Sequence, residues 1–86
     1  MRLVKITWVD SVGVYSEWGS LDPVEDVDYP CISVGYLVKD GKKIKFIVPH
    51  YASASSGLDA EEHGCGGMAI PSRAVIEIVD LIEAPK

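Results

Sequence analysis

The sequence has few cysteines, few cations and no long hydrophobic run, and each shortage excludes a class of protein. Only two of its 86 residues are cysteine, so the chain can form at most one internal disulfide and can supply at most two thiolate ligands to a metal. Eight Lys and Arg residues against 13 Asp and Glu give a net charge of −5, which argues against binding to a nucleic-acid backbone. No stretch approaches the roughly 20 apolar residues of a membrane-spanning helix. We therefore expect a soluble protein whose partners include neither nucleic acid nor membrane.

The N-terminal segment MRLVKITWVD also lacks the marks of a secretory signal. Lys5 and Thr7 interrupt its apolar run, and no small-residue cleavage site follows. The sequence therefore predicts a cytoplasmic protein, in which Cys31 and Cys65 stay reduced.

The remaining composition suits a single small domain over residues 1–86. Hydrophobic residues make up 48% of the chain, as in globular proteins. A chain of this length buries only about 60% of its unfolded surface, so its hydrophobic core gives only a small net stability. Because the two cysteines limit disulfides and metals as supplements, we expect the chain to gain stability as a homo-oligomer.

Five segments have the β-branched composition or the alternation typical of strands. They are residues 2–9, 31–38, 44–49, 67–70 and 75–82. In the first segment, Val4, Ile6 and Trp8 share one face and form the better core side. Between the second and third, Asp40-Gly41 predicts a tight hairpin because both residues tolerate a positive φ.

Two long segments lack periodicity and are expected to be loops. Residues 10–30 are rich in acids and turn formers, with one helical turn expected over residues 22–27. Residues 50–66 are mostly small and polar, and a short helix over residues 58–62 is the alternative there. A loop this long in so small a domain is either functional or mobile.

These elements predict a mainly β fold, a small five-stranded antiparallel barrel of the SH3 or Sm-like kind. An OB-fold is the chief alternative, since a helix over residues 58–62 would suit it. The glycines of residues 64–67 allow close backbone approach, and Pro71 ends a strand by removing a ladder donor.

Residues 67–75, GMAIPSRAV, resemble the end of SH3 domains, where a glycine-rich strand runs into an Ile-Pro-Ser turn before a closing Val. The likeness covers about nine residues. The paired tryptophans and acidic-aromatic opening of polyproline-binding SH3 domains have no match here. The resemblance therefore implies the fold and not the polyproline function.

Longer motifs resemble small proteins encoded by bacteriophages. They are ITWVDS (6–11), EWGSLD (17–22), CISVGYLV (31–38) and GCGGMAIPSRAVIEIVDL (64–81). This resemblance implies a phage setting, and hence the host cytoplasm, without implying a particular activity.

Metal binding and catalysis are both weakly indicated. Cys31, His50, His63 and Cys65 are potential zinc ligands, but they include no paired CxxC knuckle, so no metal or other cofactor is expected. The same histidines and Cys65 lack the organising motif of a nucleophile and base. No phosphate-binding or dinucleotide fingerprint is present. The sequence thus predicts a protein that is not an enzyme.

A ligand-binding hypothesis rests on the residues that follow the third strand and on the closing segment. Tyr51 can stack on a ring, hydroxyls and glycine amides can donate to phosphate oxygens, and Arg73 can contact a phosphate in a bidentate manner. The alternative is a flexible loop with an interfacial tyrosine. Trp18 is either a ligand clamp or the lid over an open barrel end. The candidate site comprises Trp18, His50, Tyr51, Ser53, Ser55, Ser56, Gly66, Gly67 and Arg73.

Two functions remain open from the sequence. The first is a phage accessory, anti-defence protein that sequesters a small nucleotide-derived host signal as a homo-oligomer. The second is an interaction module that docks on a host protein through strand edges or the acidic loop of residues 17–28 and inhibits it.

Overall fold

The computed structural model describes residues 1–11, 18–20, 26–54 and 61–84, and these form a mainly β structure. No α-helix occurs in those ranges. The elements are β1 (Leu3–Val9), β2 (Pro30–Asp40), β3 (Ile44–Val48), β4 (His50–Ala52), β5 (His63–Cys65), β6 (Met68–Pro71), the 3₁₀ turn η2 (Ser72–Ala74) and β7 (Val75–Asp80). The predicted fold class is confirmed at this level.

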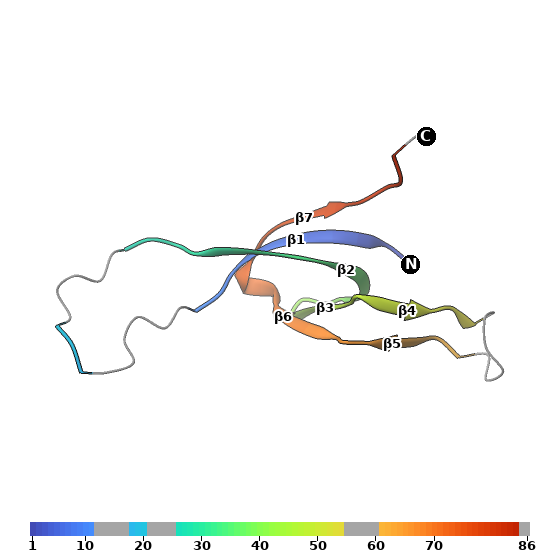
Figure 1. Cartoon of the computed structure of the whole chain (residues 1–86), viewed down its shortest axis with the longest axis horizontal. Coiled ribbons are helices and arrows are strands. Elements are labelled where there is room, and N and C mark those ends of the chain that lie inside the picture. Colours follow the sequence, from blue (N-terminus) through green and yellow to red (C-terminus); the bar gives the residue numbers. More distant parts are fainter. Residues whose placement is uncertain (12–17, 21–25, 55–60, 85–86) are drawn as a thin grey trace.

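Five of the strands form one antiparallel sheet in the order β6-β3-β2-β1-β7 (Figure 1). They correspond to the five predicted strands, with ends that differ by one or two residues. The Asp40-Gly41 hairpin is also confirmed, since Asp40 is paired with Lys45 and the Gly41 amide donates to the Ile44 carbonyl at 2.9 Å. The pairing of β2 with β3 shifts between Leu37 and Lys39, and such a bulge bends a strand.

The prediction of a closed barrel is wrong for the chain on its own. Strands β6 and β7 are the two edges of the sheet, and the described residues contain no ladder between them. The turn η2 reverses the chain between these edges, and Val75 follows it directly into β7. Strand β6 has four residues and β7 has six, so the two free edges also differ in length.

The core lies where the bent sheet folds over on itself. Val4 and Ile6 of β1 pack with buried residues of β2, β3 and β6, which are Leu37, Ile47 and Ile70. Trp8 packs against this cluster and donates its indole N–H to Ser33 Oγ at 3.0 Å. The predicted core face of Val4, Ile6 and Trp8 is therefore confirmed.

Strands β4 and β5 were missed by the sequence analysis, which treated residues 50–66 as a loop. Their pairing continues the β3–β6 ladder in step: Ile47 faces Met68, and His50 faces Cys65 three residues further along each strand. Pro49 lacks an N–H and Gly66 has φ +75°, so the ladder is interrupted between the two halves. Three-residue strands without alternation leave no periodic signal to detect.

Two other expectations fall on residues outside the described ranges. These are most of the helical turn expected over residues 22–27 and the first part of the alternative helix over residues 58–62. In the described part of the chain, no helix is long and apolar enough to cross a membrane.

Candidate functional site

The clearest hollow with aromatic walls lies beside Tyr51, where β4 and β5 approach the ends of β2 and β3. Its volume is about 240 Å³. The Tyr51 ring is tilted by 47° against that of Tyr36 on β2, with centroids 5.5 Å apart. The hollow is lined by Met1, Val38, Phe46, Val48, Tyr51, Glu62, His63, Gly64 and Gly67.

Glycines make room for this arrangement. A Cβ on Gly67 would overlap the Phe46 ring. The ring can therefore lie against the backbone of residue 67 only because this residue is glycine. A Cβ on Gly64 would come within 3.1 Å of a Val48 methyl group. The predicted role of the glycine cluster in close approach is therefore confirmed at these two positions, and it shapes the wall of the hollow.

The hollow is apolar with an acidic rim. Burial raises the pKa of the Tyr51 hydroxyl above its ordinary value of 10.0, and a hydrogen bond with Glu62 and the charge of that carboxylate raise it further. No Lys or Arg of the described chain lines this hollow. It can accept an apolar or ring-shaped group with a donor directed at Glu62, whereas an anionic phosphate would meet a carboxylate.

Changing Glu62 to Gln is expected to lower the pKa of Tyr51 toward its ordinary value, because a nearby negative charge disfavours the phenolate. Since the folded-state pKa lies above the unfolded one, Tyr51 contributes stability below the unfolded pKa, and that contribution is lost as the pH rises through the folded pKa. An NMR titration of the tyrosine Cζ resonances measures this shift. Glu61→Gln is the control, and an unchanged Tyr51 titration in Glu62→Gln would mean that the carboxylate does not act on the phenol.

Arg73 lies elsewhere. It belongs to η2 and, together with Lys42, Lys43 and Pro71, it lines an open cleft of about 480 Å³ beside the β2–β3 turn. Tyr51 is beyond the far end of β3, whereas Arg73 follows β6 at the end where β3 begins. A single pocket containing both residues is therefore not formed within one subunit, which corrects the expected arrangement.

The remaining predicted site residues are dispersed. His50 is exposed on β4 and lines a shallow cleft with Tyr51, and Gly66 lines another with Pro49. Ser53 is half-buried after β4, while Ser55 and Ser56 lie outside the described residues. Trp18 is fully exposed, so its side chain covers no barrel end and clamps no described cavity.

Metal-ligating side chains do not converge in the described part of the chain, where no group of three or more His, Cys, Asp or Glu residues could hold an ion. Cys31 is half-buried at the start of β2, and Cys65 is an exposed free thiol on β5. His63 Nδ1 lies 2.9 Å from the Glu61 carbonyl oxygen, and this local contact orients the His63 ring.

Sequence reasoning missed the partners that build both hollows. Val38, Phe46 and Glu62 come to Tyr51 from separate elements, and only the folded sheet brings them together. Lys42 and Lys43 follow the predicted Asp40-Gly41 turn, and no sequence signal linked them to Arg73, which lies some 30 residues away.

Comparison with protein-family models, with curated proteins and with solved structures finds no match for this chain. Its function is therefore inferred from the geometry described above.

Proposed function

We propose that this chain is a non-catalytic binding protein that acts as a homo-oligomer, with the outer face of β1, β2 and β7 as the contact between copies. The observation that carries the proposal is the exposed apolar surface on that face. Ile32 and Val34 of β2 are 66% and 51% exposed, although both lie in the middle of a well-formed sheet. Exposed apolar patches on small soluble proteins often mark interaction sites.

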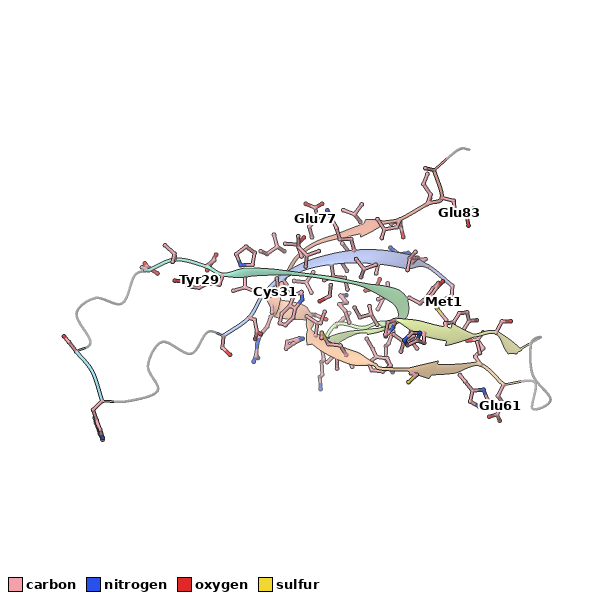
Figure 2. The ribbon with its side chains drawn as sticks, viewed as in Figure 1. Met1, Tyr29, Cys31, Glu61, Glu77 and Glu83 are labelled. Atoms are coloured by element: carbon pink, nitrogen blue, oxygen red, sulfur yellow. The ribbon has the colours of Figure 1, made fainter. Side chains whose placement is uncertain are left out.

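The strand register defines this outer face as two rows of side chains. Ile32, Thr7 and Glu77 form one row, and Val34, Lys5 and Val79 form the next. These residues alternate with Val4 and Ile6, whose side chains are buried on the opposite side of β1. Figure 2 shows Glu77 directed away from β3 and β6.

The charges on the outer face favour a second copy of this chain as its occupant. Lys5 is half-buried between Val34 and Val79, and Glu77 stands diagonally from it. Neither forms an ion pair with any other residue that the structure describes. A two-fold axis between these two positions would place each Lys5 opposite the partner's Glu77, as an isologous interface requires. Two sheets can then pack face to face with their apolar residues between them.

The resemblances of the sequence extend this proposal to the setting and the architecture. We infer a phage protein in the bacterial cytoplasm that binds a host molecule stoichiometrically, a nucleotide-derived signal being the most specific candidate. Support for an SH3-like strand arrangement comes from the Ile70-Pro71-Ser72 turn, which leads through η2 into a strand beginning at Val75.

Changing Ile32 to Glu is expected to convert a dimer into a monomer, because the carboxylate would be buried without a partner in the interface. Light scattering coupled to size-exclusion chromatography measures the mass. Ile82→Glu is the matched control, since Ile82 is 90% exposed and follows the end of β7. A wild-type protein that is monomeric at all accessible concentrations would refute the homo-oligomer.

A charge exchange tests the facing arrangement itself. Lys5→Glu and Glu77→Lys are each expected to weaken association by placing like charges together, and the double variant should restore it. If the double variant associates no better than the single ones, Lys5 and Glu77 do not face each other across the interface.

A protein partner is the second candidate function, supported by the exposed apolar side chains before β2. Trp18 is fully exposed, and Val27 and Tyr29 are about half exposed beside acidic residues. Affinity capture from host lysate separates the two functions. A stoichiometric protein that is lost with Trp18→Ala favours docking, whereas a retained small molecule absorbing as a nucleotide favours sequestration.

A further inference from the structure

The cleft between the β2–β3 turn and η2 gathers positive charge in an acidic chain. Lys42, Lys43 and Arg73 line it together with Pro71, in a space of about 480 Å³. That volume lies within the range of small-molecule sites, although this cleft is open to solvent on one side. The three basic side chains are exposed.

The fold holds these three cations in one place. Two hydrogen bonds fasten η2 to the turn: the Ser72 amide donates to the Lys43 carbonyl at 2.9 Å, and Ser72 Oγ donates to the Gly41 carbonyl at 2.7 Å. Lys42 and Lys43 therefore stand beside Arg73, although the sequence separates them widely. The backbone that carries the cations is fixed before any ligand binds, which reduces the entropy cost of binding.

The charges of this cleft are not neutralised within the described chain. Two of the other cations are paired, since Arg2 contacts Asp80 and Asp40, and Lys45 contacts Asp40. Lys42, Lys43 and Arg73 form no ion pair with the described residues, and no acid lines the cleft, although the chain has 13 Asp and Glu against eight Lys and Arg. Three like charges held together without a counter-ion favour an anionic ligand.

We propose that this cleft binds the phosphate group of a small soluble ligand. The Arg73 guanidinium supplies a bidentate fork to two phosphate oxygens, and the two lysines add point charges around it. Three positive charges suit a phosphomonoester, which carries about −1.5 to −2 at pH 7, or a diphosphate, which is more negative. Pro71 offers an apolar wall for the organic part of the ligand.

A compact phosphate fits the surroundings better than a long polyanion. The net charge of the chain is −5, with eight Lys and Arg against 13 Asp and Glu. A nucleic-acid duplex or a membrane surface requires cations over a wider area than the three that line this cleft. This inference deepens the proposed function, on which it rests, by naming the chemical class of the ligand.

The test is an ¹⁵N-NMR titration of the full chain with inorganic pyrophosphate and with ADP at constant ionic strength. Saturable shifts are expected at the amides of Lys42, Lys43, Ser72 and Arg73. Arg73→Ala should weaken binding of both probes about 10-fold or more, because charge-assisted hydrogen bonds are lost, and Arg73→Lys should recover only part of it. Lys39→Ala removes an exposed lysine that does not line the cleft and should change the affinity less than about two-fold.

Three results would overturn the inference. They are the absence of saturable shifts at the cleft, equal losses in Arg73→Ala and Lys39→Ala, and stronger binding to duplex RNA or to phosphatidylcholine vesicles carrying phosphatidylinositol phosphate than to either probe. The mass measurement keeps this test apart from the proposed function. A dimer that does not bind the probes refutes the phosphate site alone, and a monomer that binds them refutes the homo-oligomer alone.

Discussion

Replacing Ile6 with Ala is expected to lower the free energy of unfolding by about 2–5 kcal/mol, the largest effect of any variant considered for this protein. Ile6 is 0% exposed and packs with Val4, Leu37, Ile47 and Ile70, which belong to four strands. Truncation removes transfer free energy and leaves a cavity, because the surrounding backbone belongs to paired strands and can relax only in part. Domains of this size have only about 5 kcal/mol to lose, so the variant should be close to unfolded.

Urea denaturation followed by circular dichroism measures the change, with both proteins at one concentration because association would add to the apparent stability. Ile82→Ala is the matched control, since the same side chain is 90% exposed there, and its effect should stay within about 0.5 kcal/mol. Equal midpoints for the two variants would mean that the cluster around Ile6 is not the core.

Replacing Gly35 with Ala is expected to cost about 1–3 kcal/mol by overpacking. Gly35 is buried on β2, and a Cβ there would lie 2.9 Å from the Val48 carbonyl oxygen and 3.2 Å from Ile47 Cβ. A backbone carbonyl cannot rotate aside as a side chain can, so β2 and β3 would have to separate where their ladder begins. Exposed Gly19→Ala is the control in the same denaturation experiment. A Gly35→Ala protein as stable as that control would contradict the close approach of these strands.

The strands could be predicted because each has a local signature. Alternation placed Val4, Ile6 and Trp8 on one side of β1, and burial follows that alternation in the structure. Asp40-Gly41 indicated the turn between β2 and β3 because turn-forming residues stand there between two β-branched segments, although Gly41 does not adopt the expected positive φ. Such signals need no knowledge of which strand lies beside which.

The candidate sites could be predicted only in part. Tyr51 and Arg73 were identified as residues with binding chemistry, and each does line a hollow. Within one subunit the two residues line separate hollows, because their separation depends on the length and register of the β3–β6 hairpin. The continuation of this hairpin into β4 and β5 carries Tyr51 away from η2, and a three-residue strand leaves no periodic pattern in the sequence.

The sequence by itself determined the mainly β class, the positions of the five strands of the larger sheet, the core face of β1 and the acidic balance of the chain, because these follow from local periodicity and composition. Only the tertiary structure decided that the sheet stays open between β6 and β7, that Ile32 and Val34 remain exposed, and that Lys42 and Lys43 meet Arg73. The physical reason is that each of these depends on long-range strand pairing and on hydrogen bonds such as that from Ser72 to Lys43, which join residues far apart in the chain.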